Sequence, residues 1–466
     1  MISVQKGSGN FPNDFTQSAL YPRIAIPGIG GPLGVKVAVV GAGSTYTPEL
    51  VEGLIAHRDR LPVEELALID IDRDRLENVG GLAGRILARE EWQGDLVLTT
   101  DREAALDGAS YVIVQIRVGG QAARLVDETL PPRFGCVGQE TTGPGGFAKA
   151  LRTVPVVLDL AEQLEERGAP QPWIIDFTNP VGIVTQALLD DGHRAIGLCN
   201  VAIGLQRYVA GLLGVDWQRV ELEHVGLNHL SWERAVRVDE FDVLPDLLER
   251  FSGDLADHVA LPQDLLRVIG ALPSYYLRYY YLTDEVLEEQ RSGHQRSRAE
   301  EVMRIESDLL EMYRDLSLDR KPPLLEQRGG AFYSEAAARL MASLHDGTGD
   351  LQVVDVLNDG SLADLPADAV VEVPARVDRD GAHPIRLSAL QPEFSGLVHE
   401  AKAYERLTVT ASKTGSRADA LRALMANPLV PSFRVATALL DALLAANREY
   451  LPRFFLTQAA DSAWPT

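Results

Sequence analysis

Val37-Ala38-Val39-Val40-Gly41-Ala42-Gly43-Ser44 joins a short apolar run to a glycine-rich turn, and this junction decides the expected fold. The apolar run has the composition of a buried parallel strand. The segment after the turn places Leu50, Leu54 and Ile55 at helical spacing, which predicts a helix. A glycine turn between a strand and a helix lets a pyrophosphate approach the backbone at the N-terminus of the helix. The stretch therefore predicts the first unit of a Rossmann-type domain.

Further strand-like runs follow toward the middle of the chain. They occupy residues 66–70, 96–99, 111–114 and 173–176, and residues 76–89 have helical spacing. Alternating strands and helices predict a parallel sheet with helices on both faces. We therefore expect an α/β fold in which residues 35–204 form a Rossmann-type, doubly wound parallel sheet.

The pattern changes after about residue 205, where long helical stretches dominate. Helical spacing is found at 264–269, 298–315, 336–343, 396–410 and 431–450, with strand-like runs at 353–356 and 370–373. We expect residues 205–466 to form a second, α+β domain with catalytic and oligomerisation roles. Residues 1–34 are rich in Gly, Pro, Ser and Asn, so we expect a disordered extension outside both domains.

The composition excludes several classes of protein. The 466-residue chain has a net charge of −23, which argues against binding to nucleic acid or to an anionic membrane surface. No run of about 18 apolar residues appears, so no transmembrane helix is expected. The two cysteines, Cys136 and Cys199, suggest no disulfide framework and fit a cytoplasmic protein. An anionic substrate would require basic residues to be gathered at its site.

An acidic residue supports dinucleotide binding at the glycine turn. Asp70 ends the second predicted strand, where a carboxylate accepts hydrogen bonds from ribose hydroxyls and repels a 2′-phosphate, which favours NAD over NADP. Asp72 is the competing candidate. The third glycine position of the motif holds Tyr46, so a purely structural turn is the alternative. The expected cofactor contacts are Gly41, Gly43, Ser44, Thr45 and Asp70.

Two soft donor side chains suggest a metal site. Cys199 follows the apolar run 195–198, and His229 lies within 225–230. A thiolate and an imidazole can hold a divalent transition metal if water or substrate oxygens complete the coordination sphere. A buried thiol and a hydrogen-bonded histidine are the alternative.

Two further clusters carry possible chemistry. Residues 273–281 read Pro-Ser-Tyr-Tyr-Leu-Arg-Tyr-Tyr-Tyr, in which one phenol is a candidate general base with a pKa lowered by a neighbouring cation or metal. An aromatic helix face packed in the core is the alternative. Arg117 and Arg124 follow a predicted strand at the edge of the sheet where such folds bind ligands, and guanidinium groups grip phosphate oxygens. Surface ion pairs would explain them equally well.

Taken together, these motifs resemble glycoside hydrolase family 4, whose members are NAD- and manganese-dependent glycosidases, and in particular its 6-phospho-β-glucosidases. The resemblance covers nearly all of residues 35–455. Its motifs lie at 41–45, 116–128, 138–146, 177–182, 199–200, 226–229, 273–280, 326–330 and 427–432. One departure is Ala202, where these enzymes usually carry proline, and it leaves the rigidity of the metal loop open.

The resemblance implies a role for each candidate residue. Cys199 and His229 would bind the metal, and Tyr276 would be the base, with the adjacent Tyr275 as an alternative. The residues that would contact the substrate are Arg117, Arg124, Glu140, Asn179 and Asn200, with Arg298 as a phosphate contact. The resemblance also implies a homodimer or homotetramer.

The implied reaction is an exception to hydrolysis by two carboxylates. NAD would accept a hydride from carbon 3 of the sugar, and the metal would polarise the resulting ketone. Tyr276 would remove the proton from carbon 2, and the aglycone would leave carbon 1. Water would then add, and the NADH would return its hydride, so no net oxidation occurs.

Other functions fit parts of the sequence. The N-terminal half would also suit an NAD-dependent hydroxy-acid dehydrogenase, which accumulates NADH with its product. An NAD-binding sensor would tolerate loss of Cys199, His229 or Tyr276. Within the family, an α-glycosidase or an enzyme of non-phosphorylated substrates stays open.

Overall fold

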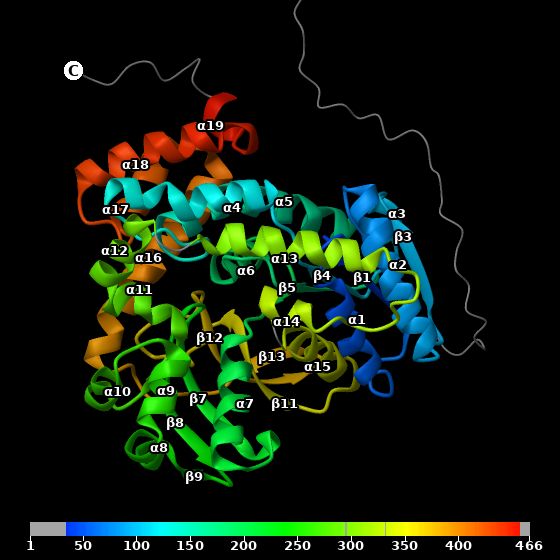
Figure 1. The fold of residues 1–466 in the computed structure, drawn as a ribbon, viewed down its shortest axis with the longest axis horizontal. Coiled ribbons are helices and arrows are strands. Elements are labelled where there is room, and N and C mark those ends of the chain that lie inside the picture. Colours follow the sequence, from blue (N-terminus) through cyan, green and yellow to red (C-terminus); the bar gives the residue numbers. More distant parts are fainter. Residues whose placement is uncertain (1–33, 294–295, 331, 457–466) are drawn as a thin grey trace, which may run out of the picture.

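The structure is a computed structural model that describes residues 34–293, 296–330 and 332–456. The predicted extension of residues 1–34 lies outside the described residues, apart from Gly34. The fold contains one large sheet and one small sheet, with helices around them (Figure 1). Within the described residues, no helix combines the length and apolar character needed to cross a membrane.

The large sheet has nine strands in the order β13-β12-β11-β6-β5-β4-β1-β2-β3. Six of these pair in parallel: β1 (Val35–Val40), β2 (Val63–Ile69), β3 (Asp95–Thr99), β4 (Tyr111–Val114), β5 (Trp173–Asp176) and β6 (Ala195–Gly197). Their order, 3-2-1-4-5-6, is that of a Rossmann fold, which confirms the predicted sheet. The strand order reverses between β1 and β4, and a ligand crevice forms at the carboxyl ends of strands on either side of such a point.

Helices cover both faces of the parallel strands, as the sequence predicts. Alternate residues of β1 show this: Val37 and Val39 pack into one apolar core, and Ala38 packs into another. The N-terminal helices are α1 (Thr47–Ala56), α2 (Arg73–Arg89), α3 (Arg102–Leu106), α4 (Gly120–Thr129), α5 (Gly143–Arg167) and α6 (Val181–Asp190). The apolar surface on each face of the sheet is therefore buried by its own helix layer.

Three strands from the C-terminal half extend the large sheet. They are β11 (Asp350–Leu357), β12 (Val370–Asp378) and β13 (Gly381–Pro384), and β11 pairs antiparallel with β6. The predicted strands at 353–356 and 370–373 therefore exist, and they extend the parallel sheet beyond β6. They cover the edge of β6, which would otherwise expose unpaired backbone groups. The boundary between residues 204 and 205 stays a prediction.

The small sheet is a hairpin that the sequence analysis missed. It consists of β7 (Val220–Leu227) and β8 (Leu230–Val238), with the short strands β9 (Phe241–Asp242) and β10 (Leu272–Pro273) pairing to β8. The end of β7 is buried on both faces, so it lacks the alternation of apolar and polar residues that identifies a half-buried strand.

The remaining helices surround these sheets, and the predicted helical stretches correspond to five of them. Those five are α10 (Gln263–Ile269), α13 (Arg298–Tyr313), α15 (Tyr333–Asp346), α16 (Pro392–Thr414) and α18 (Phe433–Ala446). Figure 1 shows α7 (Val201–Leu213), α8 (Leu244–Arg250), α9 (Ser252–Val259) and α10 gathered around the small sheet at the bottom of the view. The second part of the chain is thus of α+β type, as expected.

A buried ion pair holds α5 against α4, and it predicts a large loss of stability on mutation. Arg152 forms a bidentate pair with Asp127, in which both side chains are fully buried, and it also donates to Asn447 Oδ1 at 3.1 Å. Arg152→Ala leaves the Asp127 carboxyl buried without its cation, which costs about 3–5 kcal/mol. Urea unfolding at neutral pH measures this. Arg102→Ala removes an exposed pair with Asp159 and should cost under about 1 kcal/mol; equal losses in both variants would contradict the assignment.

A second buried cluster joins the two sheets and predicts a pH-dependent stability. His224 of β7 lies 2.6 Å from Glu233 Oε1 and 3.0 Å from Glu372 Oε2 of β12. Burial opposes the charged imidazolium, but the two carboxylates outweigh burial and raise the pKa of His224 to about 10.

The folded protein therefore retains a proton on His224 that the unfolded chain releases near its ordinary pKa of about 6.5. This contribution is full below that value and is lost as the pH rises toward 10. The stability advantage of the wild type over His224→Gln should fall by up to about 1.4 kcal/mol per pH unit in this window. Urea unfolding at several pH values tests this, and a difference independent of pH would show a neutral His224.

Candidate active site

A cleft of about 2280 Å³ opens at the carboxyl ends of the parallel strands. Most of the residues predicted to form the site line it: Gly41, Gly43, Ser44, Asp70, Arg117, Arg124, Glu140, Asn179, Asn200, Tyr276 and Arg298. They come from the loops after β1, β2, β4, β5 and β6 and from the C-terminal half. The fold therefore collects in one cleft residues that lie up to 257 positions apart in the sequence.

The glycine turn forms a cradle that side chains would fill. Gly41 has φ +90°, and a Cβ there would lie 2.7 Å from the Gln115 carbonyl oxygen. Gly43 donates its N–H to Asp70 Oδ2 at 2.8 Å. Asp72 caps α2 by accepting from a backbone N–H, so its carboxylate serves the helix. Of the two predicted carboxylates, Asp70 is the one that faces the turn.

The next two residues of the turn have different surroundings. Ser44 lines the cleft, and its hydroxyl accepts from Arg328 Nη2 at 3.4 Å. Thr45 is fully buried beneath the turn, and its carbonyl oxygen accepts from Tyr313 Oη at 2.8 Å. Arg328 was missed as a site residue, although it lies in one of the motifs on which the resemblance rests.

A carboxylate with three cationic partners lies in the wall of the cleft. Glu140 forms a very short pair with Arg117, and it lies 3.3 Å from Arg124 and 2.6 Å from the Lys149 amine. Burial alone would raise the pKa of Glu140, but the three cations hold it well below its usual range. Burial and Arg117 lower the pKa of Lys149 to about 7. Sequence reasoning missed Lys149, because nothing in its local pattern separates it from an ordinary helix lysine.

The charge of the cleft differs from that of the whole protein. Among the described residues that line it, ten are basic and nine are acidic, whereas the chain carries a net charge of −23. Basic residues are therefore concentrated in the cleft, which offsets the overall negative field for an anionic ligand.

His229 lies in the two-residue turn between β7 and β8, in the left-handed conformation with φ +62°. Its Nδ1 is 3.0 Å from Thr141 Oγ1, and its ring stacks on the Tyr276 ring at 3.6 Å between centroids. Burial lowers the pKa of His229 to about 3, so the imidazole is neutral. With Nδ1 bonded to Thr141, Nε2 is the nitrogen that remains for a metal or ligand.

Cys199 follows β6 and belongs to the same cluster. The Tyr333 hydroxyl donates to its Sγ at 3.9 Å. Burial, followed by the neighbouring Glu372 carboxylate, raises the pKa of the Cys199 thiol well above its usual value. The charges of Cys199 and Tyr276 also act on one another. Tyr276 thus contacts the His229 ring and is near enough to Cys199 for their charges to interact.

The pKa of Tyr276 differs from the expectation. Burial raises it well above its usual value, and Cys199 and Tyr279 add to this, while Arg124 acts in the opposite direction. In the protein chain alone, the predicted lowering of the phenol pKa is therefore not found, because burial outweighs the nearby arginine.

Within the described residues, Cys199 and His229 are not joined by a third His, Cys, Asp or Glu side chain that could bind the same metal ion. Over the described residues, no three His, Cys, Asp or Glu side chains are grouped to hold a metal ion. Asn179 Oδ1, after β5, is buried and has no hydrogen-bond partner within the described chain, so it is open to a ligand. A metal between Cys199 and His229 would need further oxygens from water or from a bound substrate.

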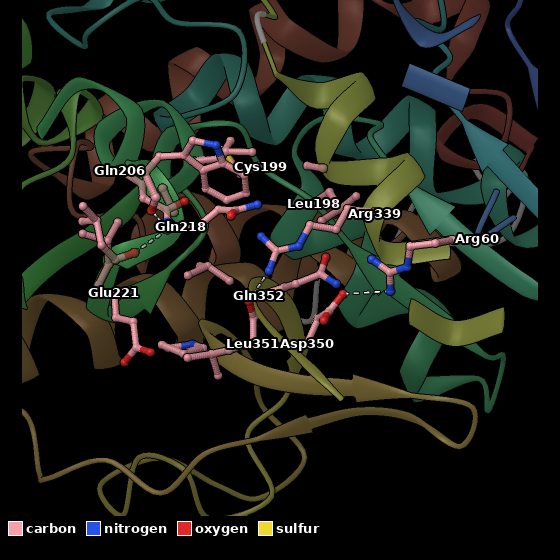
Figure 2. Close-up of a pocket in the computed structure, with 18 residues that line it drawn as sticks. Arg60, Leu198, Cys199, Gln206, Gln218, Glu221, Arg339, Asp350, Leu351 and Gln352 are labelled. Carbon is pink, nitrogen blue, oxygen red and sulfur yellow. Dashed lines mark hydrogen bonds and ion pairs between the residues drawn. The ribbon is translucent and has the colours of Figure 1, made fainter. Parts of the chain in front are cut away.

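A second, smaller cavity of about 330 Å³ lies beside this cluster (Figure 2). Cys199 lines it, whereas the next residue, Asn200, lines the cleft. Figure 2 shows Arg339 extending toward the cavity and Arg60 paired with Asp350, at 3.0 Å. Cys199 is therefore a buried residue in the wall of this cavity.

The comparisons with known proteins agree on one family. The sequence model of the family described as "Family 4 glycosyl hydrolase" matches residues 36–215. The model of the C-terminal domain of that family matches residues 224–430. The chain is 42% identical to a probable 6-phospho-beta-glucosidase of Bacillus subtilis (strain 168), over 91% of this chain and 98% of the relative. It is 36% identical to the 6-phospho-beta-glucosidase of Escherichia coli (strain K12), over 90% and 97%.

A solved structure resembles the fold over most of the chain. It is the 6-phospho-beta glucosidase from Thermotoga maritima with NAD and glucose-6-phosphate, which has a TM-score of 0.85 and 34% identity. The match covers 90% of this chain and 99% of that chain. A further structure of the same enzyme contains manganese, NAD+ and glucose-6-phosphate, and its TM-score is 0.83. The chain described above belongs to family 4 of the glycosyl hydrolases.

Proposed function

We propose that the protein hydrolyses 6-phospho-β-glucosides with NAD and a divalent metal, manganese, as cofactors. One observation carries the proposal: a single cleft unites the glycine turn, Tyr276 and the cations around Glu140, and Tyr276 stacks on His229. The relatives named as 6-phospho-beta-glucosidases support the phosphorylated β-glucoside as the substrate class.

The glycine turn suits NAD. Gly41, Gly43 and Ser44 would surround the pyrophosphate beside the N-terminus of α1, where backbone N–H groups favour an anion, and the buried Thr45 would support the turn from beneath. Asp70 would accept hydrogen bonds from the ribose, since a carboxylate oxygen that already accepts one N–H retains a free lone pair.

Cys199 and His229 suit the metal. A neutral imidazole with a free Nε2 and a cysteine sulfur are ligands that a borderline divalent ion accepts, and Thr141 fixes the orientation of the imidazole ring. When bound, NAD supplies a hydride acceptor for carbon 3 of the sugar and manganese supplies a Lewis acid for the adjacent oxygens.

Tyr276 is the proposed base for the proton on carbon 2. Its ring is held by stacking on His229, which fixes the phenol beside the metal ligands. Arg124 is a nearby cation that favours the phenolate. The alternative, Tyr275, is 40% exposed and its hydroxyl accepts from Arg278, so it lies farther from this cluster.

The remaining polar residues would bind and orient the sugar phosphate. Arg117, Arg124 and Glu140 form one rigid group in the wall of the cleft, and Asn179 and Asn200 lie on the loops beside Cys199. The phosphate contact of Arg298 stays a prediction, because its guanidinium already donates to the carbonyls of residues 327 and 328. Homodimer or homotetramer formation and a cytoplasmic location also stay predictions.

A panel of chromogenic glycosides tests the function. We expect aglycone release from an aryl 6-phospho-β-glucoside, with little from its α anomer or from the unphosphorylated β-glucoside, and only when NAD and Mn²⁺ are both present. No NADH should accumulate, because the hydride returns to the sugar within each cycle. NADH that rises in proportion to product would indicate a dehydrogenase, and equal rates with α or unphosphorylated glycosides would overturn the substrate assignment.

The proton transfer is tested by Tyr276→Phe, which keeps the ring stacked on His229 and removes only the hydroxyl. Loss of a general base lowers kcat by about 10²–10⁴-fold. Exchange of deuterium from solvent into carbon 2 of the product should fall equally, while the Kd for NAD stays unchanged. Tyr275→Phe is the matched control and should retain the activity of the wild type. A larger loss in that control would assign the base to Tyr275.

A further inference from the structure

The tyrosine that replaces the third glycine of the dinucleotide motif has a defined task. The Tyr46 hydroxyl donates to the Gly330 carbonyl oxygen at 2.6 Å and accepts from the Ser334 N–H at 3.1 Å. The Tyr46 side chain is buried. Gly330, at φ +96°, lets the Tyr46 ring pack closely against the backbone, since a Cβ at position 330 would lie 3.0 Å from that ring. Glycine at position 46 would lose both hydrogen bonds to this segment.

Tyr333, which lies between Gly330 and Ser334, contacts the proposed metal ligand Cys199. The Tyr333 ring packs edge-on against Tyr46 at 6.4 Å and tilted against Phe177 at 5.3 Å, between ring centroids. Its hydroxyl donates to Cys199 Sγ at 3.9 Å. A continuous chain of contacts therefore runs from the cofactor turn through two tyrosines to the cysteine sulfur.

The Cys199 side chain is buried, and the residue lines one wall of the cavity of about 330 Å³. A hydrogen bond to the sulfur selects one rotamer and thereby orients the lone pairs that a metal would use.

We propose that Tyr333 is a positioning residue for the metal ligand Cys199, and that Tyr46 links this position to the cofactor turn. The inference rests on the proposed function in one respect, since it takes Cys199 as a metal ligand. It implies that NAD and the metal strengthen each other's binding, because NAD would contact the turn that carries Tyr46. By thermodynamic linkage, each ligand then changes the affinity of the other by the same factor.

The test compares the wild type with Tyr333→Phe, Tyr46→Phe and Tyr208→Phe. The first two remove one hydroxyl each and keep the packed rings. Tyr208→Phe is the matched control, since its hydroxyl donates to the Asp254 carbonyl on a distant helix pair. Free Mn²⁺ is titrated by electron paramagnetic resonance, without and with saturating NAD, which gives the Kd for Mn²⁺ independently of catalysis.

Loss of a partner of a metal ligand weakens metal binding by about 10–100-fold, and we expect Tyr333→Phe to raise the Kd for Mn²⁺ by about tenfold. Tyr46→Phe should raise it less and should abolish most of the improvement that NAD produces in the wild type. Tyr208→Phe should leave the Kd unchanged. An unchanged Kd in Tyr333→Phe overturns the positioning role, and a full effect of NAD in Tyr46→Phe overturns the link.

Cobalt absorption separates failure of this inference from failure of the proposed metal site. Co²⁺ bound to a thiolate gives a sulfur-to-metal charge-transfer band, which should be present in the wild type and absent in Cys199→Ala. Absence of the band in the wild type would sink the metal site itself. A band that is present in the wild type, and identical in position and intensity in Tyr333→Phe, would sink only the role of Tyr333.

Discussion

The backbone pairing between Gly197 of β6 and Asp355 of β11 joins the C-terminal strands to the Rossmann sheet. It requires glycine, because a Cβ at position 197 would lie 2.8 Å from Asp355 Cβ and 2.4 Å from Thr185 Oγ1. The next strand, β12, then carries Glu372 to His224 of β7. The turn with His229 ends β7, and Cys199 lies two residues after Gly197. The proposed metal ligands Cys199 and His229 are thus connected through strands β6, β11, β12 and β7.

The site also depends on how buried charges are balanced. Glu140 would be costly to bury alone, and so would the cations that surround it, but together they form a group in which each charge has a partner. The same principle holds beneath the hairpin, where His224 lies between two carboxylates. The Glu140 cluster brings fixed charge to the wall of the cleft, and the His224 cluster joins the two sheets.

Local chemistry explains which features the sequence predicted. The glycine turn and Asp70 are recognisable because their roles depend on a few adjacent residues and on backbone geometry. The existence of strands β1 to β5 in a parallel sheet follows from the alternation of strands and helices along the chain. No local signal, however, indicates that β11 pairs with β6, or that β7 and β8 form a hairpin, since those strands are buried on both faces and their partners are distant. Lys149 and Tyr333 were missed for the same reason, because their importance comes from residues far away in the chain.

Tyr46 shows how a departure from a motif can be informative. Taken alone, the missing glycine weakens the prediction of a dinucleotide site. In the fold, the larger residue fills the space between the cofactor turn and the segment before α15, and its hydroxyl satisfies two backbone groups there. A local rule that is broken where several distant segments meet is more readily explained by function than by chance. On the proposed function, the turn that holds NAD and the sulfur that holds the metal are parts of one packed aromatic unit, so the two cofactors are positioned together.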